Sequence, residues 1–436
     1  MRKVCVLVLV LAGAAIIAGC AASNPYAKID EAAYRAEYGE SMTLLEKDKK
    51  KLYRDRLLYC LDKGMLAHYA EGYEDSIGLL QEGEQAIEDA FTKSVTEAIG
   101  SSIVNDKVRA YAGEDYENIY VNAFNALSYY HRGDLESALV EIRRMTEKLD
   151  FLAVAYGETI TDLQAEALEK TGTPPPDPDS SPRFSNSALA RYLGMLFYRA
   201  DGYEDDARID RDQIKIAFAN APEVYNFPLP SSIDEELDIP AGYARLNVIG
   251  FSGLSPVKEE EVLRIPIPGP RYIKIALPVM VNRPSEVARV EVVFESGLSF
   301  TLQLLEDLEA VARKTFKEKV AMIYLKSVIR ATAKGAVSST LGAVAEEVED
   351  GTASLVFGAL SLGAQIFAEA SEQADLRVSR FFPAKAYVGG ITLPPGTYAA
   401  QVRYYGYNGS LLGSSNQKRI VIRENTLNLM EAVCLK

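Results

Sequence analysis

The spacing of apolar residues changes once along the chain, near residue 240. From about Asp30 to Phe227 apolar positions recur every three or four residues, which predicts amphipathic helices. Beyond Ala241 the period is two, in stretches such as YARLNVIGF, VARVEVVF and TYAAQVRYYG, which predicts consecutive strands. The Pro-rich stretch FPLPSSIDEELDIPA separates the two patterns. We therefore expect an α+β fold with two lobes, a helical domain over residues 30–228 and a β domain over residues 240–436.

A second helical pattern interrupts the β domain. Positions such as Phe316 and Val320 predict a helical insertion at about residues 302–377. The chain is uncharged from Gly351 to Ala368, a length that allows a membrane segment, but its Ser, Thr and Gln residues favour a buried helix. Because neither β block is large alone, we expect both to form one sandwich-like domain around this insertion.

Twelve residues of the helical region occur twice in nearly the same form. GMLAHYAEGYED begins at Gly64 and GMLFYRADGYED begins at Gly194, and eight of the positions are identical. This is similar to a tetratricopeptide (TPR) repeat, in which small residues let two helices approach and an aromatic residue begins the second helix. A middle copy lies in ALSYYHRGDLESALVEIRR. The positions that carry the pattern are Gly64, Tyr73 and Ser76, then Ala126, Leu135 and Ala138, and finally Gly194 and Tyr203.

The repeat hypothesis has further consequences and one alternative. Gly72, Gly133 and Gly202 fall where each first helix must turn, and Tyr73 and Tyr203 are expected to pack in the core at these corners. The spacing between copies leaves room for degenerate repeats. An ordinary helical bundle is the alternative, and the identities between the outer copies favour repeats.

The N-terminus has the features of a bacterial export signal. Arg2 and Lys3 precede an apolar run of about 14 residues, shorter than the roughly 20 that a membrane span needs. Ala18-Gly19-Cys20 resembles a lipobox, which implies that residues 1–19 are a signal peptide, that Cys20 is acylated, and that residues 20–29 are a tether. An uncleaved anchor and an ordinary secretory signal are the alternatives. With Ala21 after the cysteine, the lipobox implies the outer membrane, facing the periplasm.

Three other segments extend this resemblance. VRAYAGEDYENIYVNAFNALSYYHRGDLESALVEIRR, PVKEEE and QADLRVSRFFPAKAYVGGITLPPGTY are, with the lipobox, similar to a family of largely uncharacterised bacterial lipoproteins with TPR-like repeats. The resemblance covers most of the mature chain, and it implies an envelope location and a scaffold role without supplying catalytic residues. The tryptophan expected in the last segment is absent from this chain, and Phe381 and Phe382 would take its packing role.

The net charge of the chain limits the classes of molecule that it is expected to bind. The net charge of −14 becomes −16 when Arg2 and Lys3 leave with the signal, and a chain this acidic is a poor binder of nucleic acid. Cys60 and Cys434 are the cysteines left after the signal and the acylated residue. They could pair in an oxidising compartment, but no spacing argument brings them together, which favours buried free thiols.

The sequence contains no motif that identifies a catalytic residue, a metal site or a cofactor site. His68 and His131 lack the Cys or His partners of a zinc motif, and no phosphate-binding loop occurs. Ser252 in GFSG lacks the second glycine of a nucleophile elbow, and both histidines precede it. The carboxylates of residues 234–236 and 259–261 are expected to be solvated in turns.

Tyrosines are abundant in the helical region, and most are expected to pack structurally. Tyr69, Tyr129, Tyr130 and Tyr198 are instead candidates to line a groove on the first helices of the repeats and bind a protein partner. The resulting hypothesis is a lipid-anchored envelope scaffold or adaptor that binds envelope proteins, as an accessory to assembly or export. The alternatives are a glycan or small-molecule binding protein, and a hydrolase that uses Asp and Glu.

Overall fold

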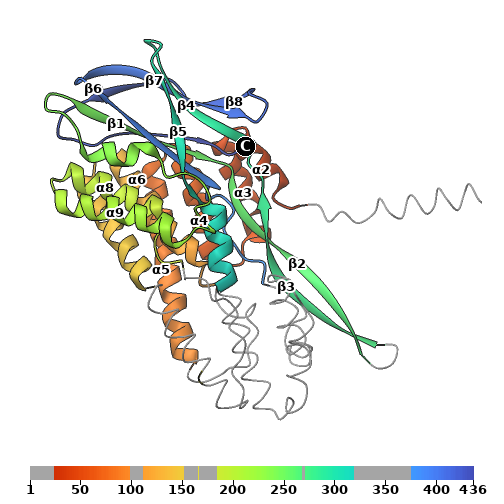
Figure 1. Ribbon diagram of the computed structural model, residues 1–436. Helices are drawn as coiled ribbons and strands as arrows, with labels where there is room; N and C mark the ends of the chain where they lie inside the picture. The colour runs from red at the N-terminus through yellow and green to blue at the C-terminus, as the bar shows by residue number, and fades with distance from the viewer. Residues whose placement is uncertain (1–23, 99–110, 152–164, 166–183, 268–270, 319–374) are drawn as a thin grey trace, which may run out of the picture.

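The computed structural model describes residues 24–98, 111–151, 165, 184–267, 271–318 and 375–436. Helices dominate the first part and strands the second, so the predicted mixed α+β class is confirmed. In Figure 1 the helices lie against one side of a large curved sheet, and a two-stranded ribbon extends away from it. The signal segment, Cys20 and most of the helical insertion lie outside the described residues.

The helices are α2 (Ala27–Tyr34), α3 (Tyr38–Leu52), α4 (Arg56–Tyr69), α5 (Tyr73–Ala98), α6 (Asp115–His131), a helix over residues 135–151, α8 (Ala188–Ala200) and α9 (Glu204–Asn220), with the 3-10 helix η2 (Ser231–Leu237) after them. Short corners connect α2 to α3, α3 to α4, α4 to α5, α6 to the helix after it, and α8 to α9. Helix α4 packs on α5, and α8 packs on α9. A capping box between Glu114 and Glu117 fixes the start of α6.

The two similar corners differ by one residue. Gly202 adopts φ +80° and Tyr203 N–H donates to Tyr198 O, whereas in the first copy Glu71 adopts φ +61° and Gly72 N–H donates to Ala67 O. Of the three glycines expected at the turns, Gly133 and Gly202 therefore adopt a positive φ, whereas Gly72 does not. Because α9 begins one residue later than its counterpart, Tyr203 is left 47% exposed and is not a core residue.

Eight of the described strands form one sheet. They are β1 (Ala244–Ser252), β4 (Val287–Phe294), β5 (Ser299–Asp307), β6 (Lys385–Leu393), β7 (Gly396–Gly406), β8 (Leu411–Ser414), β9 (Lys418–Ile422) and β10 (Asn428–Cys434). Their order is β10-β1-β6-β5-β4-β7-β8, and β9 also pairs with β7. The sheet curls until it is nearly closed, and the side chain of Lys436, after β10, donates to Leu412 O of β8 across 2.8 Å. The separate ribbon is formed by β2 (Leu254–Ile267) and β3 (Arg271–Arg283).

Strand β1 is buried on both faces along its whole length. Ile249 and Phe251 belong to the core shared with the helices, whereas Leu246 and Val248 belong to a second core inside the curl of the sheet. Gly250 of β1 faces side chains of β4 and β5 across the curl, since a Cβ there would come 3.0 Å from Val290 Cγ1 and 3.1 Å from Leu302 Cδ1. These two apolar environments explain why β1 lacks the alternation expected of a half-exposed strand.

The predicted insertion begins too early. Leu302 to Asp307 belong to β5, where Leu302 packs in the inner core of the sheet, and the described helix starts at residue 308. Residues 375–384 are also not helical, and they run to the start of β6. Val320 and the uncharged stretch from Gly351 to Ala368 lie outside the described residues.

One hydrophobic core joins the helices to the sheet. It runs from Ile29 and Leu45 through the helices to Ile249, Phe251 and Leu435. The two predicted lobes therefore share this core.

The approach of α4 to α5 depends on Gly64, and this gives a stability test. A Cβ at Gly64 would lie 2.7 Å from Leu80 Cδ2, whereas a Cβ at Gly78, in the neighbouring helix, would meet nothing within 4 Å. We expect Gly64→Ala to lower the free energy of unfolding by about 1–3 kcal/mol through overpacking. Gly78→Ala should raise it by about 0.4–1 kcal/mol. Urea denaturation measures both, and equal effects of the two substitutions would contradict the close-approach role of Gly64.

Candidate functional site at the joint between helices and sheet

Helices α4, α6 and α8 form the inner layer that faces the sheet. Most of their residues are buried, and several polar side chains are buried with them. Four buried carboxylates lie along this joint, Asp62, Glu117, Glu236 and Glu306. Glu431, whose side chain is 9% exposed, lies there as well. Buried charges need hydrogen-bonding partners, so these residues show how the two layers recognise each other.

An extended segment before β6 lies on the inner helices and is bound through its backbone. Asp62, in α4, accepts hydrogen bonds from Arg380 N (2.7 Å) and Ser379 Oγ (2.8 Å). Glu117, in α6, accepts one from Ser379 N. Burial, and then the charge of neighbouring Glu114, raises the pKa of Glu117 to about 7. The helices thus bind a stretch of their own chain as a peptide-binding surface would.

The two phenylalanines of this segment fill the space between the layers. Phe381 and Phe382 are fully buried, and Phe382 packs against Tyr116 and Phe124 of α6. Tyr69 donates to Phe381 O across 2.9 Å and is only 7% exposed. Tyr69, predicted from the sequence to contact a partner, is therefore covered by a segment of its own chain.

Glu431 of β10 lies between the two histidines of the chain. Its Oε1 is 2.7 Å from His68 Nε2 and its Oε2 is 3.1 Å from His131 Nε2. Burial raises the pKa of Glu431, but the histidines outweigh this effect and hold it far below its ordinary range. Tyr73 stacks on His131 with ring centroids 4.7 Å apart. The histidines thus connect α4 and α6 to the last strand.

Ser128, His68 and Glu431 have the connectivity of a catalytic triad. Ser128 Oγ is 2.7 Å from His68 Nδ1, and the opposite ring nitrogen faces the carboxylate. Ser128 is fully buried, and its hydroxyl also lies 3.3 Å from Ser76 Oγ. This hydrogen-bonded series therefore ends in packed side chains at Ser128. We infer that it stabilises the contact between the helices and the sheet.

Glu306 of β5 is buried at the start of α8. It accepts hydrogen bonds from Ser187 Oγ (2.8 Å), from Leu189 N, and from the hydroxyls of Tyr120 and Tyr225. Ser187 is the N-cap of α8, so the carboxyl lies at the positive end of the helix dipole. Burial raises the pKa of Glu306 to about 7 against these donors.

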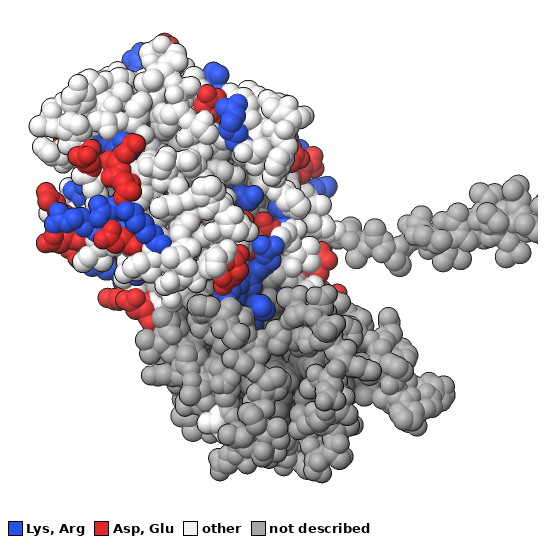
Figure 2. Space-filling model, viewed as in Figure 1, with Lys and Arg blue, Asp and Glu red and all other residues white. Residues whose placement is uncertain are grey.

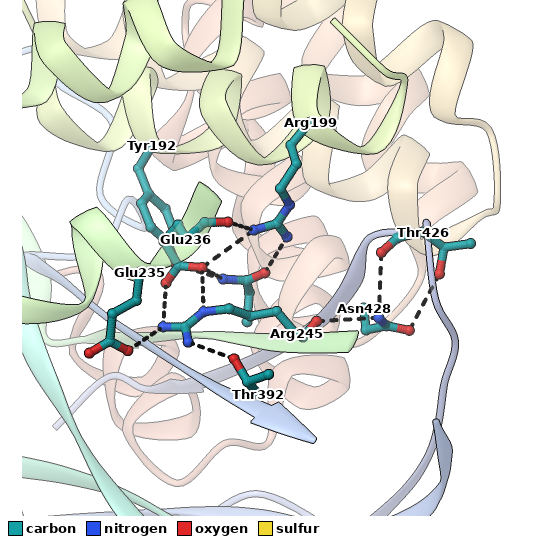
Figure 3. A network of polar contacts seen from close by, with 9 residues as sticks. Tyr192, Arg199, Glu235, Glu236, Arg245, Thr392, Thr426 and Asn428 are labelled. Carbon is teal, nitrogen blue, oxygen red and sulfur yellow. Dashed lines mark hydrogen bonds and ion pairs between the residues drawn. The ribbon is translucent and has the colours of Figure 1, made fainter. Parts of the chain in front are cut away.

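Figure 3 shows the polar network at the far end of the joint. Glu236 of η2 is fully buried and accepts from Arg245 Nε (2.8 Å) and from Asn247, both in β1. Arg199 of α8 donates to Asn247 Oδ1 across 2.7 Å and to the Glu236 backbone. The expectation that Glu236 is solvated is wrong, because Arg245 draws it into the interior.

A hollow of about 220 Å³ lies on the outer side of the helical layer, away from the joint. It is lined by Gln81, Glu84, Gln85 and Glu88 of α5 and by Arg144 of the helix over residues 135–151. At its wall, Glu84 is bound by Lys148 Nζ (2.7 Å) and Asn122 Nδ2 (2.8 Å). Burial raises the pKa of Glu84, but Lys148 outweighs this and the pKa is lowered overall.

The remaining predicted residues are divided between the two sides of the helical layer. Tyr129 borders the hollow, because its hydroxyl accepts from Gln81 Nε2 across 2.8 Å. Tyr130 is bound to β10, since its hydroxyl accepts from Leu429 N (2.9 Å), and Tyr198 is half-buried beside Tyr203.

The positions of the repeat pattern are mostly buried. Ser76, Ala126, Ala138 and Gly194 are buried, and Tyr73 and Leu135 are half-buried. Cys60 and Cys434 are buried free thiols, as favoured from the sequence.

Glu306→Gln should flatten the pH dependence of unfolding between about pH 4.5 and 7. The folded protein keeps this proton up to a pKa of about 7, whereas the unfolded chain releases it near 4.5, so stability falls as pH rises through this window. Across this window the free energy of unfolding of the wild type should fall by an amount on the order of 3 kcal/mol, and the substitution should remove this decrease. Denaturant titrations across the window measure it. Glu295→Gln, which is exposed after β4, should keep the wild-type slope, and an unchanged slope in Glu306→Gln would contradict the assignment.

Glu431→Gln should have the opposite pH dependence. Because the folded pKa of Glu431 is depressed, its contribution is fully present above about pH 4.5 and is lost as pH falls. We expect a loss on the order of 3 kcal/mol at neutral pH, from two charge-assisted hydrogen bonds, that shrinks on acidification. Thermal melts at a series of pH values test this against Glu424→Gln, an exposed residue before β10. If the stability difference between Glu431→Gln and the wild type were the same at every pH, the proposed role of the Glu431 charge would be refuted.

Within the described ranges, no group of three His, Cys, Asp or Glu residues is arranged to hold a metal ion. None of the described helices combines the length and apolarity that crossing a membrane requires. No family model, curated protein or solved structure matches this chain.

Proposed function

We propose that this protein is a lipid-anchored scaffold or adaptor of the cell envelope, which binds a protein partner through TPR-like helices and serves an envelope assembly or export system. The anchor is supported by the lipobox-like Ala18-Gly19-Cys20 after an apolar export signal. The finer fold names, TPR-like for the helices and sandwich-like for the curled sheet, belong to the same proposal.

The repeat character of the helices is supported by equivalent close approaches. A Cβ at Gly64 would meet Leu80, and a Cβ at Gly194 would lie 2.0 Å from Asp210 Oδ2. In both copies the contacted residue is 16 positions later. In the middle copy Ala126 and Ile142, which are both fully buried, have the same spacing in the sequence. A shared spacing of contacts is what stacked helical repeats produce.

The hollow beside Tyr129 is the observation that carries the partner-binding proposal. The inner faces of α4 and α6 are covered by Phe381, Phe382 and β10, so a partner would bind the outer side of the layer. There the hollow offers amide, carboxylate and guanidinium groups next to a half-buried tyrosine. A concave polar surface beside a tyrosine suits recognition of a protein segment.

In-cell photocrosslinking from position 85 tests this proposal. Gln85 is exposed in the hollow, and Thr301 is exposed on β5 as a control in the sheet. We expect a probe at position 85, but not at 301, to capture one discrete envelope protein, identified by mass spectrometry. Glu88→Ala with Gln81→Ala should reduce the adduct. Equal capture from both positions, or uncrosslinked protein from position 85 with full probe incorporation, would contradict partner binding at the hollow.

A further inference from the structure

The end of α3 concentrates positive charge in an otherwise acidic chain. Residues 47–56 read KDKKKLYRDR, with six basic and two acidic side chains, whereas the whole chain has a net charge of −14. Five of the six basic residues are exposed, and one of them, Arg56, pairs with Glu82. We call the other four the basic end of α3: Lys47, Lys50, Lys51 and Arg54.

These cations are not balanced by neighbouring carboxylates. None of the four forms an ion pair with the parts of the chain described above. On α9, by contrast, Arg208 pairs with Asp205 and Lys215 pairs with Asp234 across 2.6 Å. Figure 2 shows this mixture of signs over α8 and α9.

The helix dipole explains only part of this pattern. Lysines in the last turn of α3 complement its negative end, and Lys50 and Lys51 lie there. Lys47 precedes that turn and Arg54 follows the end of the helix. The cations therefore extend beyond what the dipole favours.

The basic end of α3 lies next to the point where the tether would enter. Tyr26, directly before α2, donates to Leu52 O at the end of α3 across 3.3 Å, and its ring packs edge to face on Tyr53 at 6.1 Å. The described chain starts at Asn24, four residues after Cys20. Four residues of extended chain span at most about 14 Å. An acyl group on Cys20 would therefore hold the basic end of α3 close to the lipid headgroups.

We propose that the basic end of α3 docks on anionic phospholipid headgroups and sets the orientation of the protein on its membrane. This inference rests on the proposed lipid anchor. Each Lys or Arg near an anionic surface contributes favourably over about one Debye length, roughly 8 Å at physiological salt. An acyl anchor combined with a basic patch is also a stable form of membrane attachment, since the two signals act together.

Amine footprinting on vesicles tests the surface directly. The chain from Cys20 onward is attached through an N-terminal histidine tag to nickel-chelating lipid, in phosphatidylcholine vesicles with or without phosphatidylglycerol. Acetylation of Lys50 and Lys51 is compared by mass spectrometry with that of Lys215 on α9. We expect Lys50 and Lys51 to be protected severalfold only when phosphatidylglycerol is present, with loss of protection in high salt and no change at Lys215.

The tag separates this proposal from the proposed anchor. It places the chain on the vesicle whether or not Cys20 is acylated in cells, and the mass of the native N-terminal peptide reports acylation independently. Equal labelling of Lys50 and Lys51 on both kinds of vesicle would overturn the docking surface even if Cys20 carries lipid. Protection on phosphatidylcholine alone would also overturn it, because the proposed attraction requires anionic headgroups.

Substitutions give a quantitative check without any tether. For the untagged chain, binding to phosphatidylglycerol vesicles in flotation assays should weaken about fivefold for each of Lys47→Ala, Lys50→Ala and Arg54→Ala. Lys215→Ala is the matched control and should bind as the wild type does. These side chains are exposed, so their loss should leave the fold intact, which circular dichroism verifies. Equal binding by all variants would refute the proposal.

Discussion

A buried carboxylate must find hydrogen-bond donors, and in this protein most of those donors are supplied across the joint between helices and sheet. Asp62 and Glu117 accept hydrogen bonds from backbone N–H groups of the segment before β6. Glu306 accepts one from the backbone N–H of Leu189 at the start of α8. Glu431 forms hydrogen bonds with two histidines. Leaving any of these groups unpaired in the interior would cost several kcal/mol. The position of each helix on the sheet is therefore fixed by polar groups as well as by apolar packing.

This constraint decides which surfaces of the helical layer are open to other molecules. In a solenoid of helical repeats the first helices commonly line the concave binding surface. Here α4 and α6 are covered by Phe381, Phe382 and β10, so this protein uses that surface to build its own fold. The helices and the sheet are consequently expected to unfold together. The partner recognition proposed above would therefore use the outer side of the layer, where Tyr129 of α6 borders the hollow.

The sequence was sufficient to predict element types, because periodicity reports which faces are buried. It placed the change from helices to strands correctly, and it identified Gly64 and Gly194 as close-contact positions. It failed where burial depends on partners distant in sequence. Tyr69 is covered by Phe381, 312 residues later, and Glu236 is neutralised by Arg245. Leu302 continued a helical pattern but packs inside the curled sheet, which only the pairing of strands reveals.

Net charge and local charge have different consequences for this chain. The net charge of −14 argues against clustered contacts to nucleic acid phosphates, yet it conceals the cations of residues 47–56. On an anionic membrane the same imbalance would act as an orienting force. Carboxylates elsewhere on the surface would be repelled, whereas the basic end of α3 would be attracted within a Debye length. A short tether beside Tyr26 would add a geometric restraint in the same direction. With both acting at one corner of the molecule, a single orientation is favoured without a membrane-spanning helix among the described elements.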